Sequence, residues 1–511
     1  MKTLYLLIIS ILIIINTNAQ QIQWQKCLGG SDDDYASSIQ QTTDGGYIVT
    51  GFTRSSDGDV WGNHGFADYW IVKLNAGGDT LWTKCLGGSN YDYAYSIQQT
   101  SDGGYIVAGR TSSSDGDVWG NHGNFDCWIV KLNASGDTLW TRCLGGSDDD
   151  EAYSIQQTTD GGYIAAGLTY SINGDVWGNH GSADYWIVKL NANGDTLWTR
   201  CLGGSDGDYA LSIQQTTDGG YIASGYTLSI DGDVWGNHGG YDSWIVKLDA
   251  SGDTLWTKCL GGSDYDNAYS IIQTSDGGYI VAGHTSSSNG DVLGNHGSND
   301  SWIVKLNASG DTLWTRCLGG SYEDYAFSIQ QTSDGGYIVA GFTDSNNGDV
   351  WGNHGFADYW IVKLNAGGDT LWTKCLGGSD DDYASSIQQT GDGGYIVAGY
   401  TWSIDGDVWG NHGGGDSWIV KLYADGVIVE EYNNNFNISI YPNPSTGVIR
   451  INNEKLRIKN VEVFDIYGKE LLKSKIRSTK HEVDLSHQPK GIYIIKVTTS
   501  NGVAVEKVIL E

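Results

Sequence analysis

The chain of 511 residues carries a formal net charge of −32, and the acidic excess lies in its first 437 residues. Residues 20–437 contain 16 Lys/Arg and 53 Asp/Glu, a net charge of −37, whereas residues 438–511 contain 12 and 8, a net charge of +4. A field of that sign repels nucleic acids and anionic membranes and attracts cations and basic partners. The composition therefore argues against a nucleic-acid partner.

The N-terminus has the pattern of a secretory signal peptide. Lys2 supplies a positive start, residues 4–15 form an uncharged apolar run, and Thr17-Asn18-Ala19 offers small residues before Gln20. The run is shorter than the ~20 residues of a transmembrane helix. We predict that residues 1–19 are removed on export and that the mature chain has no transmembrane segment; the alternative is an uncleaved anchor.

An internal repeat of 58 residues then recurs seven times without insertion or deletion. In the first copy the alternation of apolar residues and the Gly/Asp turns predict four strands. Those strands are Ala36–Thr42, Tyr47–Thr53, Tyr69–Asn75 and Thr80–Leu86.

Four antiparallel strands in each of seven units predict an all-β protein with a seven-bladed β-propeller at residues 20–427. A solenoid is the weaker alternative, because its coils are shorter and its ends need atypical capping repeats. The chain begins with a lone strand, Ile22–Leu28, that resembles the fourth strand of a repeat, and the last repeat lacks a well-formed fourth strand. We therefore expect the N-terminal strand to complete the last blade and close the ring.

Seven of the eight cysteines are spaced 58 residues apart, one for each repeat. Equivalent positions in neighbouring blades should lie beyond the ~7 Å Cα separation that a disulfide allows, so we expect buried thiols. Cys127 stands outside this series and is expected to be a free thiol, with a bridge to a neighbouring cysteine as the alternative.

The recurring motifs LGGS, DGGYIVAG and IVKL, followed by TLW, resemble the bacterial seven-bladed propeller repeats called SBBP-type, over residues 22–425. The resemblance implies the fold. It implies little about function, since such propellers serve as binding platforms, surface proteins and, less often, enzymes.

Composition changes at an Asn-rich linker, residues 428–437, and residues 438–511 read as a small β-sandwich with alternating strands. This tail resembles the type A C-terminal sorting domain of the type IX secretion system of Bacteroidetes-type bacteria. The matching residues are Tyr441, Pro442, Asn443, Pro444, Gly447, Gly491, Tyr493 and Lys496, with a Tyr467-Gly468-Lys469 motif between them. The resemblance implies recognition by the type IX secretion machinery and a secreted or outer cell-surface protein.

In an antiparallel blade, the connection between the second and third strands lies on the same face as the connection to the next blade. Both connections are acidic here, so one face of the propeller should be strongly negative. The copies differ most at the positions of Phe52, Arg54 and Phe66, and such divergence over an unchanging scaffold is typical of a binding surface. Neutral drift in solvated loops is the alternative. The candidate ligand-binding residues are Phe52, Arg54, Arg110, Tyr170, Tyr226, His284, Tyr400 and Trp402.

One recurring polar group suggests calcium. Asp34, Asp59, Asn63 and Asp68 could supply the oxygen ligands that Ca²⁺ prefers. The alternative is that these side chains cap tight turns through hydrogen bonds to the backbone. No other cofactor is indicated.

No nucleophile motif, phosphate loop or metalloprotease helix occurs, so catalysis has little support. We predict an exported surface or secreted protein that binds a glycan or a protein through the acidic, variable face, as in adhesion. The alternatives are an extracellular polysaccharide-active enzyme and a structural surface component.

Overall fold

The computed structural model describes residues 20–425, 438–453, 457–465, 470–499 and 503–510. Within those ranges the regular structure is β-strand, and no helix there has the length and apolar composition needed to cross a membrane. The predicted signal peptide and the predicted linker lie outside the described residues. The chain divides into two compact units, Met1–Val427 and Ile428–Glu511.

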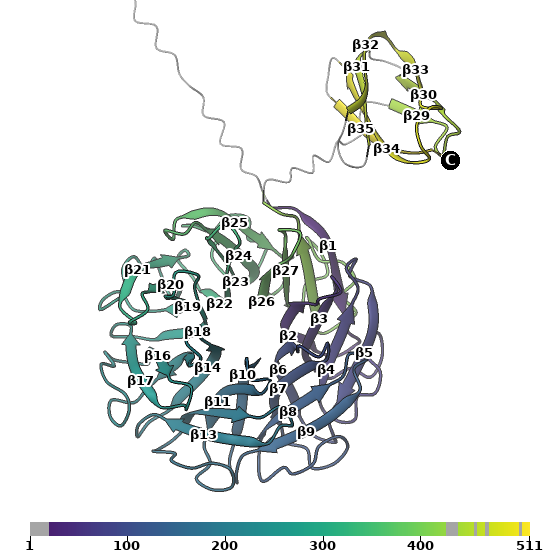
Figure 1. The fold of residues 1–511 in the computed structure, drawn as a ribbon. Helices are drawn as coiled ribbons and strands as arrows, with labels where there is room; N and C mark the ends of the chain where they lie inside the picture. Colours follow the sequence, from purple (N-terminus) through teal and green to yellow (C-terminus); the bar gives the residue numbers. More distant parts are fainter. Residues whose placement is uncertain (1–19, 426–437, 454–456, 466–469, 500–502, 511) are drawn as a thin grey trace, which may run out of the picture. The chain divides into compact units, whose positions relative to one another are not determined.

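The first unit contains seven four-stranded antiparallel sheets, arranged as blades around a central channel (Figure 1). The first blade consists of β2 (Asp34–Gln41), β3 (Tyr47–Thr53), β4 (Asp68–Leu74) and β5 (Thr80–Leu86), paired in that order. The strand nearest the channel is called inner below, and the others second, third and outer. The predicted all-β propeller is confirmed.

The remaining strands repeat this pattern. The other inner strands are β6 (Asp92–Gln99), β10 (Asp150–Gln157), β14 (Asp208–Gln215), β18 (Asp266–Gln273), β22 (Asp324–Gln331) and β26 (Asp382–Gln389). The other second strands are β7 (Tyr105–Thr111), β11 (Tyr163–Thr169), β15 (Tyr221–Thr227), β19 (Tyr279–Thr285), β23 (Tyr337–Thr343) and β27 (Tyr395–Thr401). The other third strands are β8 (Asp126–Leu132), β12 (Asp184–Leu190), β16 (Asp242–Leu248), β20 (Asp300–Leu306), β24 (Asp358–Leu364) and β28 (Asp416–Leu422). The other outer strands are β9 (Thr138–Leu144), β13 (Thr196–Leu202), β17 (Thr254–Leu260), β21 (Thr312–Leu318) and β25 (Thr370–Leu376).

The N-terminal strand β1 (Ile22–Leu28) closes the ring. It pairs antiparallel with β28, with Cys27 opposite Trp418, and so serves as the outer strand of the seventh blade. The Gln25 side chain fastens it further, because its Oε1 accepts a hydrogen bond of 2.6 Å from Trp418 Nε1. The prediction that this strand completes the last blade is confirmed.

The hydrophobic core of the propeller is divided among the seven contacts between blades. Every third strand is buried along its whole length, because neighbouring blades cover both of its faces. Adjacent residues of an outer strand point to different contacts, so Cys85 and Leu86 belong to separate clusters. All eight cysteines, Cys127 included, are buried and free, as expected.

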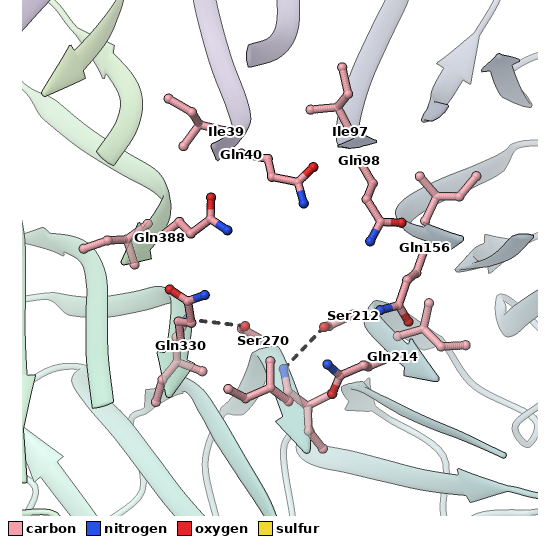
Figure 2. A pocket seen from close by; sticks show the side chains of 16 residues that line it. Ile39, Gln40, Ile97, Gln98, Gln156, Ser212, Gln214, Ser270, Gln330 and Gln388 are labelled. Carbon is pink, nitrogen blue, oxygen red and sulfur yellow. Dashed lines mark hydrogen bonds between the residues drawn. The ribbon is translucent and has the colours of Figure 1, made fainter. Parts of the chain in front are cut away.

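The inner strands form the channel wall and have one unpaired edge each. Neighbouring blades satisfy these edges through side chains. Gln98 Oε1 accepts a hydrogen bond of 2.6 Å from the Gln157 backbone N–H of the next blade, and Ser96 Oγ accepts one of 3.2 Å from Ile155. Gln99 Oε1 reaches in the opposite direction, to the Thr43 backbone N–H at 2.8 Å. Figure 2 shows the glutamines around the opening.

The glutamine ring has one gap. The inner position held by glutamine in six blades, among them Gln40 and Gln98, is Ile272 in the fifth blade, which offers no oxygen to the Gln331 backbone N–H. The ring therefore joins six of the seven pairs of neighbouring blades.

Each inner strand also contains a β-bulge. In the first blade the pairing of β2 with β3 shifts between Ala36 and Ser38, so Ser37 is an extra residue. The same shift recurs in the other six blades. A bulge redirects a side chain and increases the local twist, and here it turns one residue of each blade toward the channel.

The second unit is a small sandwich of two sheets. One sheet has the order β29 (Ile438–Tyr441), β30 (Val448–Asn453), β33 (Lys480–Asp484). The other has the order β32 (Glu470–Ser478), β31 (Ile458–Asp465), β34 (Gly491–Thr499), β35 (Val503–Leu510). Their facing apolar side chains form a single core cluster.

From the glutamine ring we expect two substitutions to change the free energy of unfolding in opposite directions. Gln98→Ile leaves the Gln157 N–H without its acceptor and should lower the free energy of unfolding by about 1 kcal/mol or more. Ile272→Gln supplies the missing acceptor for Gln331 and should raise it by up to about 1 kcal/mol. Denaturant titration of both variants checks this, and the same sign for both would contradict it.

Candidate functional site

The two longer connections of each blade lie together on one side of the ring, called the loop face below. The backbone N–H of Ser31 donates to Asp57 Oδ1 at 2.8 Å, and that of Asp32 donates to Ser55 Oγ at 3.0 Å. Asp59 N–H donates to Gly29 O at 2.8 Å. The two acidic loops, expected on the same face, are therefore joined to each other by hydrogen bonds.

Two fully buried aspartates meet beneath the loop face at each junction between blades. Asp68 begins a third strand, and Asp92 begins the inner strand of the next blade. A Cβ added at Gly87 would lie 2.7 Å from Asp68 Oδ1 and 2.5 Å from Asp92 Oδ2, so only glycine fits between them. The seven pairs are Asp416/Asp34, Asp68/Asp92, Asp126/Asp150, Asp184/Asp208, Asp242/Asp266, Asp300/Asp324 and Asp358/Asp382.

Burial makes these carboxyls difficult to ionise. Asp68 Oδ2 accepts hydrogen bonds from His64 Nδ1 at 2.6 Å and from its backbone N–H at 3.1 Å, while Asp68 Oδ1 has no partner among the described residues. Burial raises the pKa of Asp68 to about 6 and that of Asp382 to about 7. At every junction, burial raises the pKa of both aspartates above the ordinary range.

The four residues suggested for calcium are engaged in hydrogen bonds that hold the loops. Asp34 Oδ2 accepts from Ser55 Oγ at 2.7 Å and from the Gly30 N–H at 2.7 Å. Asn63 Nδ2 donates to Ser55 O at 2.9 Å. In addition, Asp34 shares its junction with Asp416 of the seventh blade, whereas Asp68 shares one with Asp92. Among the described residues, no group of three or more His, Cys, Asp or Glu side chains is arranged to hold a metal ion. Calcium at these four residues stays a prediction.

Above the junctions, two positions in each blade form an aromatic belt around the loop-face mouth of the channel. One position lies on the inner strand and the other opposite it on the second strand, as with Tyr35 and Phe52. Rings also meet across blades: Tyr35 stacks on Tyr400 with centroids 4.1 Å apart, and Phe52 lies 4.6 Å from Tyr93. The belt residues are Tyr35, Phe52, Tyr93, Arg110, Glu151, Leu168, Tyr209, Tyr226, Asn267, His284, Tyr325, Phe342, Tyr383 and Tyr400.

Five of the eight suggested ligand-binding residues belong to this belt: Phe52, Arg110, Tyr226, His284 and Tyr400. Two of the five are committed to packing. Arg110 lies 4.3 Å above the ring of Phe125 and pairs with the buried Glu151 at 2.6 Å. His284 is 3% exposed, and burial lowers its pKa to about 3, so it packs as a neutral ring.

The other three suggested residues, Arg54, Tyr170 and Trp402, follow the second strands on the loop face. Arg54 pairs with Asp33 at 2.9 Å, and the Tyr170 hydroxyl lies 2.8 Å from that of Tyr209. Trp402 packs edge-on to Tyr400, with centroids 5.4 Å apart. The structure thus brings Trp402 and Tyr400 together but spreads the eight residues around the ring.

A cavity of 430 Å³, the loop-face cavity, lies across the channel below this belt. It is lined by Ser37, Tyr95, Tyr153, Leu211, Tyr269, Phe327, Phe342, Tyr383, Ser385 and Tyr400. Seven of these are the bulge residues, one from each blade. Five blades place a large side chain there, whereas blades one and seven place Ser37 and Ser385. The cavity is therefore asymmetric, and its open side lies at those two blades.

The sequence analysis missed the bulge residues. Aligning the seven copies would have shown that this position varies among Ser, Tyr, Leu and Phe between an invariant alanine and an invariant serine. Only one of the eight suggested residues, Tyr400, lines the cavity. Burial raises the pKa of Tyr400 to about 12, so its hydroxyl is protonated and can donate a hydrogen bond at neutral pH.

In the second unit, the first sorting motif touches the C-terminal strand. The Tyr441–Pro442 and Asn443–Pro444 peptide bonds are cis. Asn443 Oδ1 accepts a hydrogen bond of 2.9 Å from the Ile509 N–H. The first sorting motif is thus joined to a strand residue that lies 66 positions later in the chain.

The remaining motif residues support the sandwich. A Cβ added at Gly447 would lie 2.8 Å from Ser486 Cα, and its φ of +141° favours glycine. Gly491 begins β34, and the buried Tyr493 donates its hydroxyl hydrogen bond to Pro489 O at 2.5 Å. Lys496 lies 3.9 Å from Glu462. The Tyr467-Gly468-Lys469 motif lies outside the described residues.

Comparison with protein families assigns this second unit. Residues 439–511 match the model of the secretion system C-terminal sorting domain. The chain therefore carries a type IX secretion tail, as its motifs implied, and is a secreted or outer cell-surface protein.

The chain is similar to other proteins at low sequence identity. The chain is 24% identical over 303 residues to the regulatory protein FlaEY of Caulobacter vibrioides, covering 53% of this chain and 31% of that protein. The chain thus spans about a third of that relative. It is similar to the extracellular domain of a protein described as a one-component system from B. thetaiotaomicron, with 11% identity, a TM-score of 0.39, and coverage of 94% and 57%. PorZ, a surface component of the type IX secretion system of Porphyromonas gingivalis, shows 9% identity, a TM-score of 0.35, and coverage of 97% and 87%.

The buried aspartates predict an unusual pH dependence. Because the folded-state pKa values of Asp68 and Asp382 lie above the ordinary value of 3.8, the folded protein binds these protons more tightly than the unfolded chain. The melting temperature should therefore rise as the pH falls from about 8 to about 5. Below about pH 4 the trend should reverse, because hydrogen bonds from Thr42, Gly46 and Lys73 outweigh burial and lower the pKa of Asp44 to about 2.

Asp358→Asn isolates one junction. The substitution removes the negative charge of a carboxylate whose Oδ1 has no partner among the described residues. The asparagine side chain can instead donate an amide N–H toward Asp382. This variant should be more stable than the parent at about pH 8 and should show a weaker dependence on pH. Thermal melting at several pH values tests both, and a variant less stable than the parent at every pH would contradict the proposed protonation.

Proposed function

We propose that this exported protein is a glycan-binding protein and that a sugar residue occupies the loop-face cavity. The observation that carries the proposal is the asymmetry of the cavity. Seven identical side chains at the bulge position would make a symmetric channel, but five large side chains and two serines leave room on one side. A single off-centre ligand requires such a break in symmetry.

The lining suits a pyranose ring. Tyrosine and phenylalanine faces stack on the apolar face of a sugar, and tyrosine hydroxyls hydrogen-bond to its edge. The volume of 430 Å³ lies within the ~300–1,000 Å³ usual for small-molecule sites. The acidic loops around the opening disfavour an anionic sugar.

The same lining supports binding rather than hydrolysis. A glycosidase needs two carboxyl groups flanking the scissile bond. The residues that line this cavity are aromatic, leucine and serine side chains. A protein ligand on the loop face, as in adhesion, is the second candidate. It is favoured by the exposed rings of Phe66 and Phe356, which are 60% and 66% exposed.

The test fills the cavity with residues that the chain already tolerates. Ser37→Tyr combined with Ser385→Tyr reproduces the tyrosines of the equivalent bulge positions, such as Tyr95 and Tyr153, so the fold should be kept. Glycan-array binding by the mature chain should weaken by about tenfold or more, equivalent to about 1.4 kcal/mol.

Thr50→Ala is the matched control, because it copies the alanine found at this buried position in most other blades. It should leave glycan binding unchanged. Unaltered glycan binding by the double tyrosine variant, with a native melting temperature, would exclude the cavity as the site. Binding of a protein but of no glycan on the array would favour the second candidate.

A further inference from the structure

A second feature of the loop face follows the repeat symmetry instead of breaking it. Six blades expose a tryptophan almost completely in the connection between the second and third strands, with 74–80% of each side chain accessible. These residues are Trp61, Trp119, Trp177, Trp235, Trp351 and Trp409. The fifth blade carries Leu293 at the same position, 76% exposed. Large apolar side chains exposed to this degree are costly for a secreted protein and commonly mark an interaction site.

The loop is anchored on both sides of the tryptophan. Val60, before Trp61, is buried, and its N–H donates to Asp57 O at 3.1 Å. After it, Asn63 Nδ2 donates to Ser55 O at 2.9 Å, and His64 is fixed on Asp68 at 2.6 Å. The tryptophan therefore projects from an anchored segment, and binding a ligand would cost little entropy for ordering the backbone of this loop.

Recent duplication of the blades does not by itself account for the tryptophans. Other positions of the same connection have diverged among the copies: Arg54 corresponds to Leu228 and Trp402, and Phe66 corresponds to Gly240. The segment from Gly58 to Gly65 is the same in all seven copies apart from Leu293 in place of the tryptophan, while positions on either side of this segment have changed. A role shared by the blades explains that difference.

The surroundings indicate the charge of the ligand. Asp59 belongs to the same connection as Trp61 and recurs as aspartate in every blade, whereas Asp57 is replaced by asparagine in three blades. Residues 20–437 carry a net charge of −37. An indole face attracts a cation, and neighbouring carboxylates strengthen the attraction. A sugar ring that carries an amino group satisfies both, because it can stack on the indole and place its ammonium among the carboxylates.

We propose that the six tryptophans are equivalent subsites for a polysaccharide of amino-substituted pyranose units. Similar subsites repeated around a ring suit a ligand built of identical units, because several contacts form along one chain and their affinities reinforce one another. A folded basic protein without internal repeats would not place equivalent groups on six equivalent tryptophans. This site is separate from the loop-face cavity.

The test uses chitosan, a glucosamine polymer, with the mature full-length chain. Affinity should rise steeply with polymer length, because longer chains reach more subsites. The triple variant Trp119→Leu, Trp235→Leu, Trp351→Leu should lower the affinity for long chitosan by about 10²-fold. The fold should survive, since the fifth blade already carries Leu293 at this position.

Two comparisons separate this binding from simple charge attraction and from the cavity. Polylysine should bind the parent and the triple leucine variant equally, and the Ser37→Tyr, Ser385→Tyr variant should bind long chitosan as the parent does. Equal chitosan affinity of the parent and the triple leucine variant would overturn the proposal. A loss of polylysine binding as large as that of chitosan would do the same and would indicate a basic polypeptide as the ligand.

Discussion

The propeller depends on how the unpaired edges of its seven inner strands are satisfied. The unpaired N–H and C=O groups of an exposed edge destabilise the fold, and they also offer a template on which another chain can pair. Here the edge N–H groups donate to serine and glutamine side chains of the adjacent blades, in both directions around the ring. The same contacts therefore protect the channel wall and join the blades, which otherwise touch mainly through apolar clusters.

This use of the inner strand determines where ligand-binding residues can lie. In the first blade Gln40 and Gln41 are committed to hydrogen bonds with neighbouring blades, Ala36 and Ile39 to the core, and Asp34 to a junction. Ser38 occupies a position that is serine in every copy. The two remaining positions, those of Tyr35 and Ser37, are the ones at which the copies differ most freely. Both lie toward the loop face, and they form the aromatic belt and the loop-face cavity. Variation is concentrated at these two positions because their side chains are not needed for the core, the junctions or the hydrogen bonds between blades.

Sequence reasoning predicted the blade number, the four strands and the closing strand, because repeat length, turn residues and alternation are local signals. It began the inner strand at Ala36, whereas the strand begins at Asp34, whose backbone N–H bonds to Gly415 O of the seventh blade. It also grouped Asp34 with Asp68, although each meets an aspartate of a different blade. These contacts depend on the register between blades, which ring closure determines and no local pattern records. For the same reason Gly87 reads as a turn residue in the sequence, while the structure shows it between two carboxylates.

Symmetry distinguishes the two proposed sites. A closed ring of near-identical blades offers any single ligand seven equivalent positions, so one defined site on the axis requires that some blades differ. Ser37 and Ser385 supply that difference at a position where larger side chains prevail. A polymer has the opposite requirement, because each of its identical units binds best when it finds the same contact as the unit before it. The exposed tryptophans meet that requirement at the ends of anchored loops, away from the positions that vary. Duplication of one blade can therefore supply both kinds of site. Positions that stay the same in every copy provide repeated contacts, and the few positions that the fold does not constrain can vary and so form a single asymmetric cavity.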